Sequence, residues 1–378
     1  MAIFDEAEYA RRVDIVRSRM RALGVAVLLL DECEALEYLF GSAQSLSFYR
    51  AGILPLSEPP TMMPRHLDEA PFREASWVGD VRPFADWEDP VAHAAQVLRQ
   101  RGFGSAAIGL DLGSYALGVR RFAAYQAALP DARFIDIDTM IDEVRLVKSE
   151  AEVAVLRRAS AIADAAMLRA VAAIRPGGTE RDAAVAASAA FVEMGADTGA
   201  CGPITSGVGT GFLHGHLHDR PLARHDIVHM ELTPRVGGYS ARLMRPAVVG
   251  AILPRQRQVA ATVIDLQDRQ IAAMRTGASA RDVDAIMREG LLAAGLRTRF
   301  DNITGYTLGF YHRAGPRTSD FTRVFAPNAD YALATGMVFH VYAAADGVAF
   351  SESVLVTPAG GERLTRLPRQ IFVAGDAV

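Results

Sequence analysis

The sequence predicts an α/β protein with two domains, and two patterns carry that prediction. In the first third of the chain, amphipathic helical segments alternate with short apolar runs, as in a mixed α/β domain. Further along, the eight residues Arg175–Asp182 (RPGGTERD) recur 100 positions later as Arg275–Asp282 (RTGASARD). The 378 residues suffice for two domains. We expect the first over residues 1–145 and the second over 146–378.

Helices and strands follow one another in the first domain. Apolar residues at helical spacing predict helices over Tyr9–Leu23, Val91–Arg101 and Phe122–Leu129. Short apolar runs predict strands over Val25–Leu30, Ala106–Leu112 and Arg133–Ile137. The run at Val25–Leu30 is far too short to cross a bilayer, so we interpret it as a buried strand.

The repeat organises the second domain. Ser149 and Glu152 form a capping-box pattern that opens a helix running to about Ala173, and Thr179 opens the next helix. In both copies of the repeat a long helix precedes the motif, and a capped helix and a strand-like segment follow it. This context predicts two pseudo-equivalent helix–helix–strand halves around one shared sheet, with a cleft suited to an active site between them.

Composition excludes several classes of function. The net charge of −4 does not favour nucleic acid or an anionic membrane as a partner. Two cysteines make neither a disulfide framework nor a Cys-rich zinc site. There is no Walker P-loop and no G-x-S-x-G elbow. The acidic start of the chain does not resemble a signal peptide, so we expect a cytoplasmic protein.

Histidines concentrate in one stretch of the second domain. Five of nine fall within residues 212–232, namely His214, His216, His218, His225 and His229. The segment Asp226–Thr233 reads as a strand in which Val228, Met230 and Leu232 face the core and His229, Glu231 and Thr233 face the opposite side. After a turn at Gly237–Gly238, a returning strand over Tyr239–Val249 brings Arg242 near Glu231.

Several motifs together resemble one known superfamily. They are His214, Arg220, Leu222 and Asp226, then Gly238, Tyr239, Leu243 and Arg245, and the stretches Arg145–Glu152, Gly305–Gly309, Gly336–Phe339 and Ser351–Thr357. In this order they resemble the creatinase and proline-peptidase superfamily over nearly the whole chain. The resemblance implies a creatinase-like N-terminal α/β domain and a C-terminal pita-bread domain. The latter has two pseudo-symmetric halves around a curved antiparallel sheet.

The chain departs from the peptidases of this superfamily at every metal-binding position. Those peptidases hold two metal ions with two Asp, one His and two Glu. The corresponding positions here are Glu231, Arg242, Tyr306, Tyr342 and Ser351, with Glu352 adjacent to the last. A guanidinium stays protonated and cannot ligate a metal. We therefore expect no metal and no cofactor.

The superfamily also has a metal-free branch that includes creatinase and ectoine hydrolase. Ser47–Arg50 (SFYR), the strand around Glu231 and the pattern of Tyr239–Arg245 resemble ectoine hydrolase. The acidic residues with which creatinase holds its guanidinium are replaced here by Met244 and Tyr342. Creatine is therefore a poor substrate candidate.

These residues favour a metal-independent hydrolase of a C–N bond in a small carboxylated amidine or guanidine, possibly cyclic. The reacting carbon is already cationic, so a carboxylate suits it better than a metal dication. We expect His214 to be the general acid/base and Glu231 to bind the cation or attack its carbon. Arg50 pairs with the substrate carboxylate beside Phe48, and the resemblance implies that both come from the partner subunit of a homodimer.

Five more residues are expected to bind substrate: Arg242, Tyr306, His312, Tyr342 and Glu352. Plainer interpretations remain open. His214 can be a surface histidine, Glu231 and Arg242 a structural ion pair, Arg50 part of a domain-interface salt bridge and His312 a loop cap.

Two other functions also remain open. One is a divergent peptidase with a single metal on His214, His216 and His218. The other is a non-catalytic binding protein on the same fold.

Overall fold

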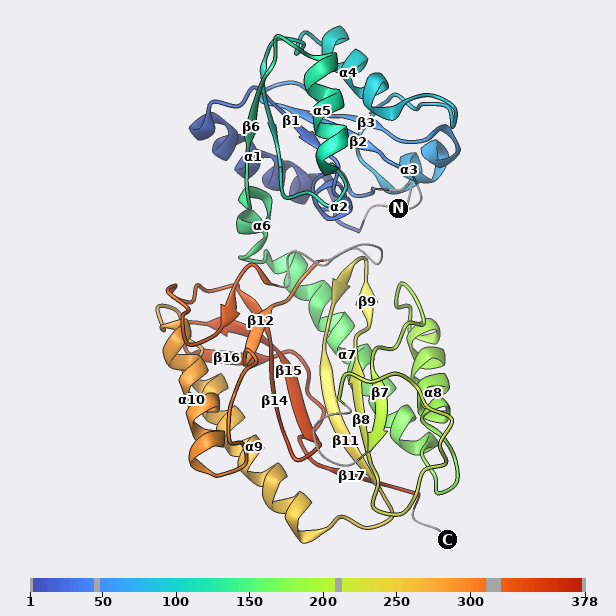
Figure 1. The fold of residues 1–378 in the computed structure, drawn as a ribbon, viewed down its shortest axis with the longest axis vertical. Coiled ribbons are helices and arrows are strands. Elements are labelled where there is room, and N and C mark those ends of the chain that lie inside the picture. The colour runs from blue at the N-terminus through green and yellow to red at the C-terminus, as the bar shows by residue number, and fades with distance from the viewer. Residues whose placement is uncertain (1–2, 44–47, 208–212, 311–320, 376–378) are drawn as a thin grey trace. The chain divides into compact units, whose positions relative to one another are not determined.

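The computed structural model describes residues 3–43, 48–207, 213–310 and 321–375. These residues form two compact units, one made from Met1–Arg145 and the other from the described residues after it, beginning at Leu146. Both units are drawn in Figure 1, and each is described by itself below.

The N-terminal unit is built on a six-stranded mixed sheet in the order β4-β3-β2-β1-β5-β6. Its strands are β1 (Val27–Leu30), β2 (Ala51–Pro55), β3 (Thr61–Met63), β4 (Asp80–Val81), β5 (Ala107–Leu110) and β6 (Arg133–Asp136). Its α-helices are α1 (Glu6–Leu23), α2 (Cys33–Phe40), α3 (Glu69–Ala75), α4 (Pro90–Gln100), α5 (Gly118–Ala128) and α6 (Met140–Arg145), with a 3-10 turn at His66–Asp68.

Strand β1 shows why the run at Val25–Leu30 is so apolar. It pairs with β2 antiparallel and with β5 parallel, so it lies in the middle of the sheet. Leu28 and Leu30 pack into the cluster formed with α1 and α2, whereas Val27 and Leu29 pack into the cluster formed with α4 and α5. Because both faces are covered, every residue of the strand is buried.

The C-terminal unit is a pita-bread fold, as predicted, with two pseudo-symmetric halves around a curved antiparallel sheet. The sheet order is β13-β12-β14-β15-β11-β8-β7, with β16 added to β15 and β17 added in parallel to β11. Its strands are β7 (Ile204–Gly207), β8 (Ile227–Leu232), β11 (Leu243–Val249), β12 (Gly305–Thr307), β13 (Val324–Phe325), β14 (Val338–Ala345), β15 (Val348–Thr357), β16 (Gly360–Arg363) and β17 (Phe372–Ala374). A separate two-stranded ribbon joins β9 (Arg235–Val236) and β10 (Tyr239–Ser240).

The helices of this unit come in two pairs that match the sequence repeat. They are α7 (Glu150–Ala173), α8 (Glu180–Glu193), α9 (Pro254–Ala273) and α10 (Ala280–Ala293). Both copies of the repeat form the turn within a pair, where Gly177 and Gly277 have φ values of 75° and 82°. The capping box predicted at Ser149 and Glu152 opens α7.

Both helix pairs cover the same face of the sheet, as Figure 1 shows. Val228 and Met230 of β8 pack against α7 and α8, and Val341 and Val354 pack in the cluster that includes α9 and α10 residues. Since neighbouring residues of a strand point to opposite faces, the residues between these apolar ones point away from the helices.

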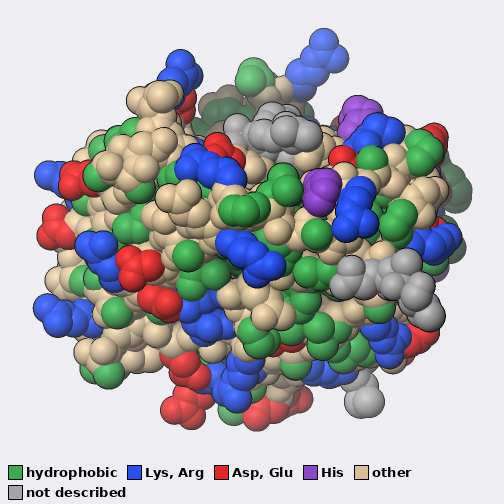
Figure 2. Space-filling model, turned by 90° about the horizontal axis from the view of Figure 1, so that it is seen from below, with side chains coloured by type: hydrophobic (Ala, Val, Ile, Leu, Met, Phe, Trp, Pro, Cys, Tyr) green, Lys and Arg blue, Asp and Glu red, His purple; other side chains and the backbone are tan. Residues whose placement is uncertain are grey.

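The exposed surface mixes charges of both signs. Figure 2 shows Lys, Arg, Asp and Glu side chains scattered among apolar ones over the face that it presents, with no single basic patch. Within the described residues, no helix is both long enough and apolar enough to span a bilayer.

Candidate active site

A row of side chains crosses the sheet on the face that the helices leave uncovered. Backbone pairing places Glu231 of β8 opposite Met244 of β11, Met244 opposite Ser351 of β15, and Ser351 opposite Tyr342 of β14. Directly paired residues share a face, so these four side chains lie side by side although they are far apart in the sequence. Three of them, Glu231, Ser351 and Tyr342, are positions at which the sequence departs from the pattern of the peptidases. A fourth such position, Arg242, lies next to Glu231.

A second row runs two residues away on the same face. Tyr306 of β12 pairs with His340 of β14, and His340 pairs with Ser353 of β15. Arg242 completes this row, because its backbone N–H donates to Ser353 Oγ at 2.9 Å. The fifth departing position, Tyr306, therefore belongs to the same cluster.

Arg242 holds the acidic and phenolic members of the cluster. Its Nη1 donates to Glu231 Oε1 at 3.2 Å and to the Tyr306 hydroxyl at 2.7 Å. All three side chains are buried. The approach of Arg242 to Glu231 that the hairpin predicted is therefore confirmed.

Ser351 contributes a hydroxyl where the peptidases carry a carboxylate. Its Oγ accepts the backbone N–H of Met244 at 2.8 Å. The serine thus joins two strands through its side chain, and it offers no negative charge to a ligand.

Tyr342 stays a neutral phenol beside the carboxylate. Burial raises the pKa of Tyr342, the nearby Glu231 charge raises it further, and a hydrogen bond with Asn302 and the guanidinium of Arg297 lower it. Its ring centroid lies 5.9 Å from that of Tyr306 and 5.2 Å from that of His340. At neutral pH its hydroxyl can therefore donate a hydrogen bond.

Two buried histidines complete the cluster. His229 lies two residues before Glu231 on β8, and His340 lies two residues before Tyr342 on β14. Burial, followed by the charge of His214, lowers the pKa of His229 to about 3. Burial also lowers the pKa of His340 well below its usual value, with Arg242 and His214 adding to the effect. Both rings are neutral at physiological pH.

His340 was missed in the sequence, although its signal was present. The alternation along β14 places it on the same face as Tyr342, which had been singled out. No ring nitrogen of His229 or His340 has a hydrogen-bond partner within the described parts of the chain.

His214 is exposed and lies near this cluster. Its charge acts on both His229 and His340. Its neighbour Leu213 packs against the small cluster that contains Met244 and Tyr342. The structure therefore places His214 near the buried histidines of the cluster, and its catalytic pairing with Glu231 stays a prediction.

His216 and His218 are directed elsewhere. The His218 backbone N–H donates to Glu180 Oε2 at 2.6 Å, and its Nδ1 lies 3.3 Å from Glu180 Oε1. The His216 ring centroid lies 4.7 Å from that of His218. Across the described ranges, no three His, Cys, Asp or Glu side chains are grouped so that they could hold a metal ion.

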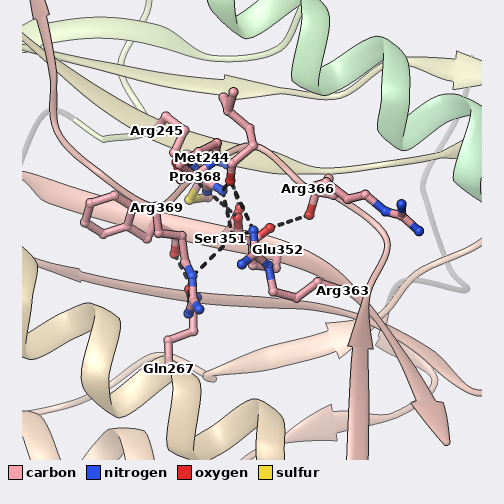
Figure 3. A network of polar contacts seen from close by, with 12 residues as sticks. Met244, Arg245, Gln267, Ser351, Glu352, Arg363, Arg366, Pro368 and Arg369 are labelled. Carbon is pink, nitrogen blue, oxygen red and sulfur yellow. Dashed lines mark hydrogen bonds and ion pairs between the residues drawn. The ribbon is translucent and has the colours of Figure 1, made fainter.

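The prediction that Glu352 lines the substrate pocket needs correction. Glu352 follows Ser351 on β15, so it points to the opposite, helix-covered face, where it is 0 % exposed. Its Oε1 lies 2.7 Å from Arg245 Nη2, 3.4 Å from Arg363 Nη2 and 3.6 Å from Arg369 Nε. Figure 3 shows these side chains gathered around Glu352, with Gln267 of α9 beside Arg369. Glu352 is therefore a structural anion.

Two predicted substrate-binding residues lie in the N-terminal unit. Arg50 is 6 % exposed, and its guanidinium donates to the Phe48 carbonyl at 3.3 Å and to Cys33 Sγ. Phe48 is 37 % exposed, and the Arg65 guanidinium lies 4.6 Å from its ring centroid. His312, also predicted to bind substrate, lies outside the described residues.

Comparison with known proteins shows which families and which proteins the chain is similar to. Residues 154–358 match Metallopeptidase family M24, and residues 12–147 match the Creatinase/Prolidase N-terminal domain. An uncharacterised hydrolase/peptidase of Sinorhizobium fredii is 29 % identical, and the ectoine hydrolase of Halomonas elongata is 22 % identical, each alignment covering 98 % of both chains. The crystal structure of dipeptidase PepE from Mycobacterium ulcerans is 27 % identical with a TM-score of 0.80, covering 98 % of this chain and 99 % of that one.

Proposed function

This chain belongs to metallopeptidase family M24, and we propose that it is a hydrolase that cleaves a C–N bond without a metal ion. The substrate class is a small carboxylated amidine or guanidine, possibly cyclic. The observation that carries the proposal is the Arg242–Glu231 ion pair, since it puts a fixed cation among the five positions at which the family's peptidases bind metal.

The family's name implies a metal, and the residues present do not fit one. The cluster offers one carboxylate, Glu231, and Arg242 already holds it. The remaining groups are two phenols, a serine hydroxyl used by the backbone, and two imidazoles. Two divalent ions need several anionic ligands, and a guanidinium between them would repel both. No step of the proposed reaction therefore passes through a metal.

The proposed reaction uses a cationic carbon that needs no further polarisation. His214 takes a proton from water as the water oxygen bonds to the amidinium carbon. The protonated imidazole then gives this proton to the leaving nitrogen as the C–N bond breaks. Breaking this bond leaves a protonated amide and a neutral amine, and His214 then carries the hydroxyl proton of the protonated amide to the amine. The products are an amide and an ammonium group, so one water molecule is consumed and the positive charge leaves on the amine.

Glu231 binds the cation in this proposal. A carboxylate next to the amidinium stabilises it by charge, and the neutral Tyr342 hydroxyl beside Glu231 supplies a hydrogen bond. The ion pair with Arg242 favours this role over nucleophilic attack, because a carboxylate oxygen that accepts a guanidinium hydrogen bond is a weaker nucleophile. A covalent adduct on Glu231, detected by mass spectrometry of quenched turnover, would contradict the assignment.

We further propose a homodimer in which Phe48 and Arg50 of one subunit complete the site of the other. The exposed ring of Phe48 supports a contact outside its own unit. For Arg50 to reach a ligand, its guanidinium must leave Cys33 and the Phe48 carbonyl.

The second candidate is a divergent peptidase, and the names of the relatives favour it. PepE of Mycobacterium ulcerans is a dipeptidase, and the Sinorhizobium relative is called a hydrolase/peptidase. Against these, the ectoine hydrolase relative aligns along its whole length and is named for a substrate that is not a peptide.

Turnover of matched substrates by matched variants tests the first proposal. We expect hydrolysis of carboxylated cyclic amidines, and no hydrolysis of Xaa-Pro dipeptides, by wild type in the presence of a chelator. His214→Ala and Glu231→Gln are expected to reduce turnover at least 100-fold, whereas His66→Ala, an exposed histidine of the N-terminal unit, leaves it unchanged. Chelator-sensitive dipeptide hydrolysis would favour the second candidate.

A further inference from the structure

The cluster contains an imidazole to which the proposed reaction gives no role. His340 is fully buried, lies on the same sheet face as Tyr342 and Arg242, and uses neither ring nitrogen in a hydrogen bond to the described residues. Buried polar atoms in folded proteins almost always have a partner. A neutral imidazole offers one donor and one acceptor, so His340 is equipped to hold a polar group of a ligand.

The surroundings of His340 decide which kind of group that is. The charged and titratable side chains that act on it are Arg242, from the segment before β11, and His214, from the loop before β8. Tyr306 of β12 meets the ring edge-on at 5.0 Å, and Tyr342 of its own strand stacks on it at 5.2 Å. The permanent cation in this environment is Arg242, whose charge acts on His340 and favours an anion beside it.

The negative member of the cluster, Glu231, shares one nitrogen of Arg242 with the Tyr306 hydroxyl. Glu231 acts on Tyr342 and accepts from Arg242. Arg242 Nη1 also reaches the Tyr306 hydroxyl, whose ring contacts His340. The cluster thus offers a carboxylate at Glu231 and a group of donors at Arg242, Tyr306 and His340.

We propose that His340, together with Arg242 and Tyr306, binds the carboxylate of a zwitterionic substrate while Glu231 receives its cationic end. This inference rests on the proposed function for the substrate class and adds the orientation of the substrate in the site. The contact lies within the C-terminal unit, and it takes the place of Arg50, which the sequence analysis expected to pair with the substrate carboxylate.

His229 is the matched control that the chain itself supplies. It is equally buried on the same face, and its ring nitrogens also have no partner among the described residues. Its pKa responds to burial and to His214. Because Arg242 and Tyr306 are the neighbours that make His340 an anion site, His229 is expected to contribute little to carboxylate binding.

The test uses acetate and acetamidinium as probes of the full-length protein with labelled histidine side chains. In the NMR spectrum of the rings, acetate is expected to shift the His340 signal saturably, whereas sodium chloride at equal ionic strength and acetamidinium leave it in place. His340→Phe keeps the ring stacking, identifies the signal and is expected to weaken acetate binding at least tenfold. His229→Phe is expected to change it less than twofold.

Several outcomes overturn the orientation. They are a His340 signal that acetate does not move, one that acetamidinium moves instead, or equal losses of acetate binding in the two variants. If His340→Phe does not fold, His340→Gln serves for identification, and the wild-type shifts still decide. Since no turnover is measured, failure here is distinct from failure of the hydrolase proposal, which the His214 and Glu231 variants test.

Discussion

Glu231 and Glu352 lie on opposite faces of one sheet, and each is neutralised by arginine. Glu231 pairs with Arg242 on the face that the helices leave uncovered, and Glu352 pairs with Arg245 on the face that the helices cover. Arg242 and Arg245 are three residues apart, so the alternation of the strand sends them to different sides. This relationship separates the residues of the candidate site from those that hold the fold together.

Removing Arg242 is expected to destabilise the protein. Arg242→Met leaves Glu231 buried without its cation, which costs about 3–5 kcal/mol. The double variant Glu231→Leu, Arg242→Met removes both charges and is expected to recover most of that loss. Urea denaturation of the wild type, Arg242→Met, Glu231→Leu and the double variant measures the coupling. Additive losses would mean that the two charges do not depend on each other.

Glu352→Gln is expected to lower the free energy of unfolding by about 3–5 kcal/mol, because three arginines lose their buried anion. Glu362→Gln on the adjacent strand is the control. Its partner Arg157 is 2.7 Å away, but both side chains are well exposed, so the expected loss is below about 1 kcal/mol. Denaturation midpoints of the two variants give the comparison. If the Glu352→Gln protein were as stable as the wild type but bound substrate differently, Glu352 would be a pocket residue after all.

The buried histidines are expected to make stability fall in acid. The pKa of His229 is about 3 and that of His340 is well below its ordinary value of 6.5. Below pH 6.5 the unfolded chain therefore binds protons that the folded chain does not. Each ring then lowers the free energy of unfolding by about 1.4 kcal/mol for every pH unit by which the pH falls. Urea midpoints are measured at pH 7, 6 and 5. As the pH falls, they are expected to decrease less steeply in the double variant His229→Phe, His340→Phe than in the wild type. An equal pH dependence of the midpoint in the two proteins would contradict the claim that both rings are neutral in the folded state.

Glu32 in the N-terminal unit is expected to act in the opposite direction. Burial, with the charges of Asp111 and Asp142 adding to it, raises the pKa of Glu32 to about 8. Between pH 4.5 and 8 the unfolded carboxyl has lost a proton that the folded one keeps, so stability falls as the pH rises. Glu32→Gln is expected to stabilise the protein by a few kcal/mol at pH 8 and hardly at all at pH 4.5. Thermal unfolding at both values, with the exposed Glu74→Gln as control, checks this; an equal effect at both would contradict it.

Much of the fold could be predicted from the sequence because the sequence signals for it are local. The capping box at Ser149 and Glu152, the glycine turns at Gly177 and Gly277, and the apolar run of β1 each act within a few residues of themselves. Strands β2 and β3 were not foreseen, because their place beside β1 depends on pairing between distant segments. The burial of Arg50 against Cys33 depends on such distant contacts too.

The candidate site shows the same division. Glu231 and Arg242 belong to one hairpin, so their approach followed from alternation and a turn. The face on which Glu352 lies required the register of β15 against β11 and β14, which no short segment of sequence contains. Similarity to a family motif placed Glu352 next to a pocket position, but adjacent residues on a strand point apart.

Metal binding by the purified protein tests the central claim most directly. Protein that has been expressed with added zinc, manganese and cobalt is dialysed and analysed for bound metal, in parallel with Glu231→Gln. The account predicts far less than one ion per chain in both proteins and unchanged turnover of the amidine substrate after chelation. Stoichiometric metal that Glu231→Gln removes, with activity that follows it, would contradict the account.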